Sequence, residues 1–323
     1  MKPIALCITG PTASGKTSLS LEIAERLGCE IVCADSMQIY KEMDIGTAKP
    51  TEAERRRVRH RLFDIISPSE PFSAEDYRQR ALPVCREICE AGKIPLLVGG
   101  TGLYVDTLIR GTSPTSPPSD PSLKERLLAL ASDEAGKEAL WRRLYEVDPE
   151  SAAATHKNNV RRVARALEIY ELTGIPKSEH DRKSREGEAD ILVGMITLDF
   201  HNRDILYARV DERVDEMLRM GLVDEVRSLY GRGLLDPSYT ASQAIGYKEM
   251  LGYVKGQMSL EAATEQLKLA TRRYAKRQLT WFRNKAEAYT LYVDGEDGIR
   301  PTRELCEEAL SAAENILKGL RNS

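Results

Sequence analysis

The sequence predicts an α/β fold, with a mostly parallel sheet covered by helices on both faces and an all-helical insertion. Helical segments separate most of the short apolar runs, and this alternation is typical of a parallel sheet. From Leu123 to about Gly187 the pattern is helical throughout and no strand signal occurs, so this stretch predicts helices alone. Six apolar runs are the expected strands: Ile4–Thr9, Glu30–Ala34, Leu62–Ile66, Ile94–Gly99, Ile191–Leu198 and Tyr289–Val293.

A proline-rich segment marks the boundary between the two expected parts of the chain. Residues 111–122, GTSPTSPPSDPS, hold four of the fifteen prolines, and such a run forms neither a helix nor a central strand. The strand pattern resumes at Ile191. We therefore expect an α/β core of residues 1–115 and 190–323 and a helical insertion domain of residues 116–189.

The first apolar run leads into GPTASGKT, which matches the phosphate-loop pattern G-x-x-x-x-G-K-[ST]. The segment that follows, Ser18–Arg26, has helical character, so the loop lies between a strand and a helix, as this motif requires. Backbone N–H groups of such a loop surround phosphate oxygens, and the helix N-terminus adds partial positive charge. The motif predicts a bound di- or triphosphate, but neither its identity nor the group transferred. The expected binding residues are Gly10, Pro11, Thr12, Ala13, Ser14, Gly15, Lys16 and Thr17.

Binding sites in folds of this kind lie at the carboxyl ends of the strands, and this rule selects two further loops. In the first, ADSMQIY, a carboxylate at Asp35 could accept a proton from a nucleophile that attacks a phosphorylated substrate. Asp35 could instead cap the next turn. Beside it, Ser36 and Gln38 offer hydrogen-bonding groups, and a glutamine can pair bidentately with an adenine edge.

The second loop follows the apolar run Ile94–Val98 and reads Gly99-Gly100-Thr101-Gly102. In most phosphate-loop NTPases a comparable strand ends in an acid that supports magnesium, so the missing carboxylate argues against simple ATP hydrolysis. Thr101 would place a hydroxyl at the mouth of the site, and we expect the glycines to let a ligand approach the backbone. The alternative is a helix-capping turn.

Two amphipathic helices are expected after the insertion. The first runs from Ile205 to Tyr230, and its Arg209 and Arg213 lie one turn apart. The second runs roughly from Leu260 to Phe282. On the first helix, the residues expected to face inward are Val210, Val214 and Met217; on the second, they are Leu267, Ala270 and Tyr274. The outer side of the second helix carries Lys268, Arg272, Arg273, Lys276 and Arg277.

Basic residues gather in three segments of a chain whose net charge is −3. Lys268–Lys285 holds seven positive charges in eighteen residues and no acid. Lys157–Arg165 holds four basic residues and no acid, and Arg55–Arg61 holds five arginines. Local basic patches on an acidic protein suit a selective contact with a polyanion. Solvated helix faces are the alternative interpretation for any one segment.

Composition excludes several other classes of protein. No apolar run approaches the ~20 residues that cross a bilayer. The N-terminus has no signal-peptide cleavage pattern, so we expect a cytoplasmic protein without membrane contact. The six cysteines fit free thiols, and no histidine falls at zinc-finger spacing. No Ser-His-Asp or Cys-His nucleophile set is evident.

Six motifs occur in order along nearly the whole chain: GPTASGKT (10–17), ADSMQIY (34–40), GTAKP (46–50), LVGGTGLY (97–104), SQAIGYKE (242–249) and YAKRQLTWFR (274–283). Together they resemble the tRNA dimethylallyltransferases of bacteria. The resemblance implies transfer of a dimethylallyl group from dimethylallyl diphosphate to the exocyclic amine of the adenine just 3′ of a tRNA anticodon. It also implies a P-loop kinase-like core and an insertion that grips the anticodon stem-loop.

The resemblance implies roles for the phosphate loop. An allylic diphosphate ionises toward a delocalised carbocation, so the barrier lies mainly in charge building on the departing diphosphate. The loop, Lys16 and a Mg²⁺ ion held by Thr17 would stabilise that charge. Arg213 matches a family position for diphosphate contact, and Arg209 is the competing candidate.

The resemblance also implies how the RNA is held. Asp35 would orient the adenine amine and remove its proton, and Thr101 would contact the reacting nucleotide. With Lys16 and Arg213, these are the expected catalytic residues, in a protein expected to be a monomer. The residues implied to contact tRNA are Asp35, Ser36, Met37, Gln38, Thr101, Lys124, Asn159, Arg161, Arg162, Arg273, Lys276 and Arg277.

Two other functions stay open at this point. A kinase of a small metabolite would also use the phosphate loop and Asp35, although the Gly99–Gly102 turn counts against it. A prenyltransferase acting on free adenosine phosphate would share the chemistry, but a free nucleotide needs no long basic track.

Overall fold

The computed structural model describes residues 2–109, 118–183, 189–285 and 288–322. The chain forms two compact units, one of residues Met1–Ile109 with Asp190–Ser323 and one of residues Arg110–Ala189. The expected boundary between residues 115 and 116 lies outside the described residues. Within them, no helix has the length and apolar character needed to cross a bilayer.

The first unit is built on a six-stranded sheet whose strands are all parallel, in the order β3-β2-β4-β1-β5-β6. This confirms the predicted α/β fold. Because every strand points the same way, the loops after β2, β4 and β1 emerge side by side. The strands span Ile4–Thr9 (β1), Cys29–Cys33 (β2), His60–Arg61 (β3), Ile94–Val98 (β4), Leu192–Asp199 (β5) and Tyr289–Tyr292 (β6), and a separate hairpin pairs Asp294–Gly295 (β7) with Gly298–Ile299 (β8).

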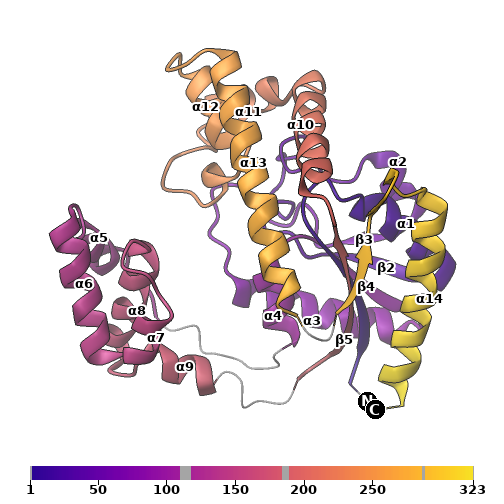
Figure 1. Ribbon diagram of the computed structural model, residues 1–323, viewed down its shortest axis with the longest axis horizontal. Coiled ribbons are helices and arrows are strands. Elements are labelled where there is room, and N and C mark those ends of the chain that lie inside the picture. Colours follow the sequence, from indigo (N-terminus) through magenta and orange to yellow (C-terminus); the bar gives the residue numbers. More distant parts are fainter. Residues whose placement is uncertain (1, 110–117, 184–188, 286–287, 323) are drawn as a thin grey trace. The chain divides into compact units, whose positions relative to one another are not determined.

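Helices cover both faces of the sheet, as the apolar alternation along the strands requires. Leu6 and Ile8 of β1 pack on one face with α1 (Lys16–Leu27) and α14 (Thr302–Arg321). Ala5 and Cys7 point to the other face, which α3 (Ala74–Glu90) and α4 (Gly102–Ile109) cover (Figure 1). The short α2 (Glu52–Arg57) lies between β2 and β3 in the sequence.

The predicted strand Leu62–Ile66 is wrong. The third strand is only His60–Arg61, which pairs with Ile31 and Val32 of β2. Leu62 and Asp64 have positive φ values of 63° and 57°, a left-handed conformation that an extended strand cannot contain. Ion pairs of Asp64 with Lys49 and Arg55 lie at this bend.

The predicted helix Ile205–Tyr230 is in fact two helices. Helix α10 (Arg203–Arg219) ends before Gly221, whose φ of 100° is incompatible with a continuing helix, and α11 (Leu222–Gly231) starts after it. Val210 and Val214 are buried as expected. Met217 is only half-buried: it packs against the edge of an apolar cluster and also lines a cavity.

Helix α13 (Leu260–Arg283) agrees closely with the prediction. Leu267 is buried in a second apolar cluster with α11, α12 (Tyr247–Val254) and the 3-10 turn Ala241–Gln243. The expected outer position of Lys268 and Arg272 is wrong, because they form ion pairs with Asp215 and Asp211 of the neighbouring α10.

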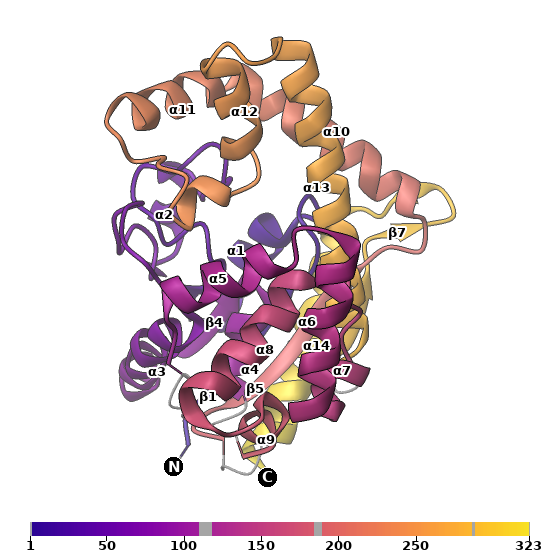
Figure 2. The ribbon, with the colours of Figure 1, turned by 90° about the vertical axis from the view of Figure 1, so that its left-hand side faces the viewer.

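The second unit is all-helical in its described part (Figure 2). Its core holds Leu123, Leu144, Val163 and Leu167. The carboxylate of Glu168 is fully buried and accepts hydrogen bonds from Ser119 Oγ, the Asp120 N–H and Arg165. The helices span Pro121–Leu130 (α5), Glu134–Val147 (α6), Pro149–Ala153 (α7), Val160–Thr173 (α8) and Lys177–Lys183 (α9).

Candidate active site

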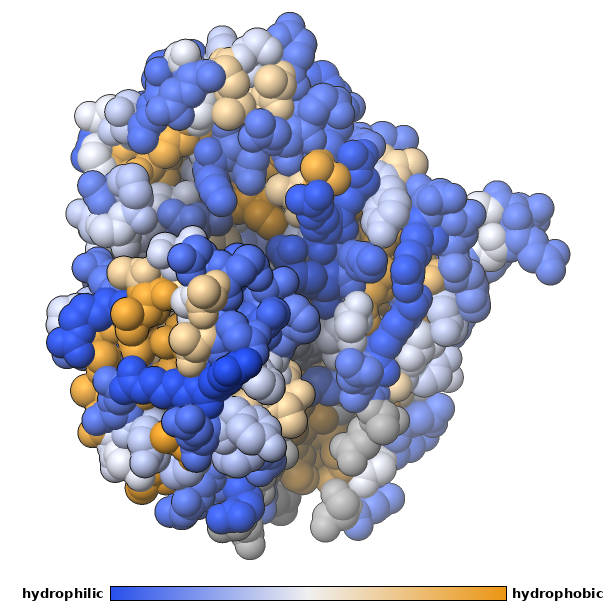
Figure 3. All heavy atoms as spheres, turned by 60° about the vertical axis from the view of Figure 1, so that its left-hand side comes forward, coloured by the Kyte–Doolittle hydropathy of each residue, from blue (hydrophilic) through white to orange (hydrophobic). Residues whose placement is uncertain are grey.

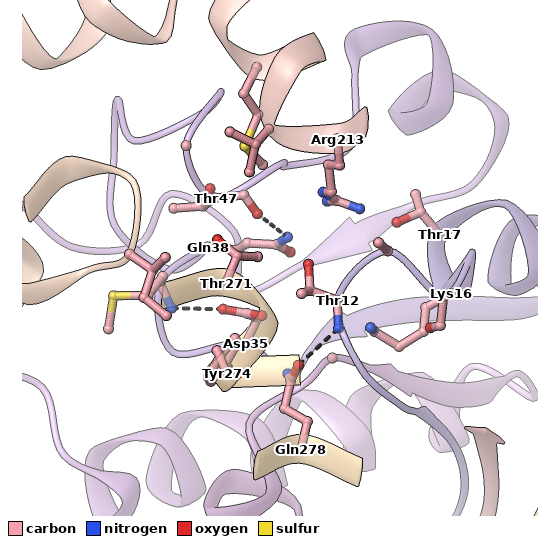
Figure 4. A pocket seen from close by; sticks show the side chains of 18 of the residues that line it. Thr12, Lys16, Thr17, Asp35, Gln38, Thr47, Arg213, Thr271, Tyr274 and Gln278 are labelled. Atoms are coloured by element: carbon pink, nitrogen blue, oxygen red, sulfur yellow. Dashed lines mark hydrogen bonds between the residues drawn. The ribbon is translucent and has the colours of Figure 1, made fainter. Parts of the chain in front are cut away.

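A cavity of about 780 Å³ lies where the loops after β1 and β2 and the end of β4 meet helices α10 and α13. Figure 4 shows Lys16, Asp35, Gln38, Arg213 and Gln278 around it. The three expected loops do converge, because β2, β4 and β1 are neighbours in the sheet. The two helices could not be placed from the sequence.

The phosphate loop has the backbone shape that its glycines permit. Gly10, Ala13 and Gly15 have φ values of 143°, 63° and 91°. A Cβ on Gly10 would stand 2.8 Å from the Leu198 carbonyl oxygen of β5, so only glycine lets the loop approach that strand. The Ser14 hydroxyl is buried and has no hydrogen-bond partner within the described residues. The loop then opens into α1 at Lys16, with the helix N-terminus at the cavity.

Lys16 folds back onto its own loop. Its ammonium donates to the carbonyl oxygens of Gly10 and Pro11, at 3.0 and 2.7 Å. The pKa of Lys16 is lowered to about 7, mainly by burial and also by the positive charge of Arg213, while the charge of Asp35 opposes the shift. A bound anion would favour the charged ammonium.

The two arginines of α10 have different surroundings. Arg209 Nε donates to the Ala13 carbonyl oxygen at 2.8 Å, so this side chain holds the phosphate loop. Arg213 Nε is buried, has no hydrogen-bond partner in the described chain, and lines the cavity. Burial lowers the pKa of Arg213, against the attraction of Asp35. Arg213 thus has a hydrogen-bond donor, Nε–H, available to a ligand in the cavity.

Asp35 lies just beyond the end of β2 and lines the same cavity. Its Oδ1 accepts a hydrogen bond from the Met37 N–H at 2.9 Å, so the carboxylate does cap its own turn. It also faces the cavity, as Figure 4 shows, and its charge acts on both Lys16 and Arg213. The two interpretations of Asp35 are therefore compatible.

Thr101 is engaged with the neighbouring loop. Its Oγ1 accepts from the Ser36 N–H at 2.9 Å and donates to Ser36 Oγ at 3.2 Å. The hydroxyl expected at the mouth of the site is thus already hydrogen-bonded to Ser36. Thr101 thus fixes the third loop to the second, while Ser36 and Met37 line the cavity.

The glycines of the Gly99–Gly102 turn admit protein, which corrects the expectation that they admit a ligand. A Cβ on Gly100 would stand 2.1 Å from Gln278 Nε2, and one on Gly102 would stand 2.2 Å from Trp281 Nε1. Both side chains come from α13. Gln278 and Trp281 are three residues apart and so lie on one face of the helix, but this spacing does not reveal what that face packs against.

Gln38 lines the cavity, and its amide nitrogen is already hydrogen-bonded to the neighbouring loop. Its Nε2 donates to the carbonyl oxygens of Thr47 and Ala48, at 2.9 and 3.1 Å. Both amide hydrogens are therefore used, which argues against the bidentate pairing with adenine and leaves Oε1 as an acceptor.

The GTAKP and SQAIGYKE motifs hold that loop in place. Glu225 accepts hydrogen bonds from the N–H groups of Asp44, Ile45 and Gly46 and from the Tyr247 hydroxyl. A Cβ on Gly46 would stand 2.5 Å from the Tyr247 ring, so glycine is needed for this contact. Glu225 and Tyr247 thus hold the loop whose carbonyl oxygens, at Thr47 and Ala48, orient the Gln38 side chain.

The three basic segments differ in their ion pairs. The arginines of Arg55–Arg61 form ion pairs with acids such as Asp64, Glu22 and Glu30, which argues against a polyanion site there. Arg273 and Lys276 of α13 are exposed and form no ion pair within the described chain, and Arg277 lies over the Tyr274 ring.

The insertion presents a similar set of exposed groups. Arg161 and Arg162 begin α8, Asn159 precedes that helix, and Lys124 lies on α5. All four are exposed, and the three basic ones form no ion pair within the described residues. Figure 3 shows a face of the molecule that is largely hydrophilic, interrupted by smaller apolar patches.

The fold and the cavity define a phosphate-loop protein with a parallel sheet. The IPP transferase family matches residues 38–285, and the chain belongs to that family. It is 49% identical over 287 residues to a tRNA dimethylallyltransferase of Bacillus velezensis, covering 88% of each chain.

Solved structures agree. The full-length tRNA isopentenylpyrophosphate transferase of Bacillus halodurans is similar with a TM-score of 0.69 and 43% identity, over 100% of both chains. A eukaryotic dimethylallyltransferase acting on tRNA is similar with a TM-score of 0.72 and 30% identity, over 90% of this chain and 74% of that one.

Proposed function

We propose that this protein transfers a dimethylallyl group from dimethylallyl diphosphate to the exocyclic amine of the adenine on the 3′ side of a tRNA anticodon. The observation that carries the proposal is the pairing of an anion site with a carboxylate in one cavity. Lys16, Arg213 and Asp35 all line this cavity, and no acid directly follows β4. The names of the relatives support the same reaction.

The anion site suits a departing diphosphate. As the carbon–oxygen bond of the allylic diphosphate breaks, negative charge builds on the leaving group, and fixed cations stabilise that charge most where water is excluded. Lys16 would exchange its two carbonyl contacts for phosphate oxygens, and Arg213 would supply the second cation, since its buried Nε has no partner among the described residues.

A magnesium ion fits the residues present. The Thr17 hydroxyl lines the cavity in the first turn of α1, and Mg²⁺ commonly takes few protein ligands when a substrate supplies phosphate oxygens. No cluster of three or more acidic, histidine or cysteine side chains occurs in the described chain, so a substrate-dependent site at Thr17 is the expected form. When bound, the ion would offset charge on the diphosphate.

Asp35 completes the reaction. The adenine amine is a weak nucleophile because its lone pair is delocalised into the ring. As the new carbon–nitrogen bond forms, the amine loses a proton, and the carboxylate of Asp35 would accept it. Gln38 Oε1 would be a second acceptor for the amine in the same cavity, and the loop that holds Gln38 is anchored by residues of α11 and α12.

The RNA would be held by exposed basic groups and by the second loop of the site. The base must leave its stack to reach the strand ends, and phosphate contacts offset this cost of a few kcal/mol. Every group named stands on one chain, so a monomer suffices. The proposed tRNA contacts are Ser36, Met37, Gln38, Thr101, Lys124, Asn159, Arg161, Arg162, Arg273, Lys276 and Arg277.

Incubation of the protein with unmodified tRNA, dimethylallyl diphosphate and Mg²⁺, followed by mass spectrometry of the nucleosides, tests the function. We expect isopentenyladenosine at the position beside the anticodon, and none when that adenine is replaced by guanine. Absence of any modified adenine would reject the proposal. Turnover of ATP with a small acceptor would instead favour a kinase.

Diphosphate binding should be coupled to protonation of Lys16. Its pKa of about 7 leaves much of the ligand-free protein with a neutral amine at pH 8, whereas the bound anion favours the ammonium. Binding of pyrophosphate then takes up a proton, and affinity falls by up to about tenfold for each pH unit above 7. Calorimetry in two buffers of different ionisation enthalpy measures the uptake. The matched Lys16→Met variant should show only the uptake due to pyrophosphate itself, and equal uptake in both proteins would refute the assignment.

Contact of α13 with the RNA predicts a salt effect. The double variant Arg273→Ala with Arg277→Ala should bind tRNA more weakly, with the slope of log K against log salt reduced by about 1 for each phosphate that the variant no longer neutralises. Filter binding at several salt concentrations measures it. Arg303→Ala, an exposed change on α14, is the control. A slope equal to that of the wild type would show that α13 does not contact the RNA.

A further inference from the structure

Gln278 of α13 joins two loops of the active site that lie far apart in the sequence. The Thr12 N–H of the phosphate loop donates to Gln278 Oε1 at 2.8 Å. Gln278 Nε2 donates to the Gly100 carbonyl oxygen at 2.9 Å. Figure 4 shows the first of these bonds, between Thr12 and Gln278. Only 5% of Gln278 is exposed, so its amide is committed to these contacts.

The surroundings leave room for this side chain and little else. A Cβ on Gly100 would stand 2.1 Å from Gln278 Nε2, so glycine is required beneath the amide. One turn earlier, the Tyr274 hydroxyl interacts with Thr101 and with Gln278. Helix α13 therefore docks on the Gly99–Gly102 turn through two polar side chains, and one of them also reaches the phosphate loop.

An amide is suited to this place for a chemical reason. The Thr12 N–H needs an acceptor, the Gly100 carbonyl needs a donor, and a primary amide supplies both at one end. A carboxylate supplies only the acceptor, and an apolar side chain supplies neither. Both backbone groups would lose their partner on replacement by methionine, which is costly where water is excluded.

We propose that Gln278 is a positioning residue that fixes the phosphate loop and the Gly99–Gly102 turn to α13. It lies next to Arg277 on the helix that we propose to contact RNA, so this inference rests on the proposed function. Gln278 acts through Thr12, which lines the cavity, and through Gly100, next to Thr101. In consequence, it sets where the diphosphate sits relative to Asp35.

The test compares Gln278→Met with Gln266→Met, a change at an exposed glutamine of the same helix. We expect Gln278→Met to raise the Kd for pyrophosphate and the KM for dimethylallyl diphosphate about tenfold, because two hydrogen bonds disappear. The KM for tRNA should change much less, since the exposed basic residues are untouched and only the Thr101 contact is affected. A general loss of structure would raise both KM values together.

Hydrogen exchange adds a direct readout. The Thr12 amide should exchange faster in Gln278→Met than in the wild type. Unchanged pyrophosphate affinity and unchanged Thr12 exchange in the folded variant would overturn the inference. Pyrophosphate binding does not depend on prenyl transfer, so the affinity measurement still tests the inference if the wild type proves to catalyse another reaction.

A second variant covers the case in which Gln278→Met does not fold. Gln278→Glu retains the size of the side chain and the acceptor for Thr12 but loses the donor to Gly100. We expect slow exchange of the Thr12 amide together with a KM for dimethylallyl diphosphate raised about tenfold. A KM equal to that of the wild type in folded Gln278→Glu would overturn the inference.

Discussion

Replacement of Asp35 by asparagine is expected to lower the rate of prenyl transfer by about 10² to 10⁴, the range typical of a lost general base. The change is nearly isosteric. Asparagine Oδ1 can still accept the hydrogen bond from the Met37 N–H, so the turn after β2 should keep its shape. What disappears is the negative charge that faces Lys16 and Arg213 and the ability to take the amine proton.

Single-turnover kinetics with saturating tRNA measure this effect, and tRNA affinity should remain close to that of the wild type. Asp204→Asn, at an exposed aspartate in the first turn of α10, is the matched control and should keep full activity. If Asp35→Asn instead loses most of its tRNA affinity while the bound complex reacts at the normal rate, Asp35 holds the RNA and is not the base.

Replacement of Arg213 by methionine is expected to make the ligand-free protein more stable and the enzyme much slower. Burial lowers the pKa of Arg213, and its Nε lacks a hydrogen-bond partner in the described residues. A half-buried guanidinium whose buried Nε has no partner costs folding free energy in the ligand-free protein, so its removal should stabilise the protein by about 1 to 3 kcal/mol. Loss of one fixed charge that stabilises the transition state should lower kcat by about a hundredfold or more.

Thermal unfolding with and without pyrophosphate separates the two effects. The wild type should gain more stability from pyrophosphate than Arg213→Met does, because only the wild type places this cation against the anion. Arg203→Met, a change at an exposed arginine of the same helix outside the cavity, should alter neither the stability nor the rate appreciably. A less stable Arg213→Met protein with normal kcat would show that the guanidinium is structural, and Arg209 would then be the remaining α10 candidate.

The two arginines show why the sequence left this assignment open. Arg209 and Arg213 lie one turn apart on α10 and are chemically identical, so nothing local distinguishes them. The phosphate loop distinguishes them. The Ala13 carbonyl oxygen, almost two hundred residues away in the chain, accepts the hydrogen bond of Arg209 Nε, whereas Arg213 Nε has no partner in the described chain.

Local sequence was sufficient wherever a feature depends on neighbouring residues. The phosphate loop is eight consecutive residues whose glycines and whose lysine at the start of α1 follow from spacing alone. Strand β1 and helix α13 were also predictable, since an apolar run and a helical apolar stripe are patterns within one element. The alternation of strands and helices predicted the parallel sheet, and the parallel sheet predicted that the loops after β1, β2 and β4 converge.

Only the tertiary structure decided the rest. The left-handed residues Leu62 and Asp64 shorten β3, and Gly221 divides a helix, although neighbouring side chains fit the longer elements. The sequence predicted an outer position for Lys268 and Arg272, but in the structure they form ion pairs with Asp215 and Asp211 of α10.

The contacts that join separate elements were the least predictable. Gln278 lies 266 residues from Thr12 and 178 from Gly100, and no pattern within α13 shows that its amide bonds to both. The sequence by itself determined which groups the active site contains, because each motif is local. Packing of elements distant in the chain decided which of those groups hold one another and which remain free for a substrate.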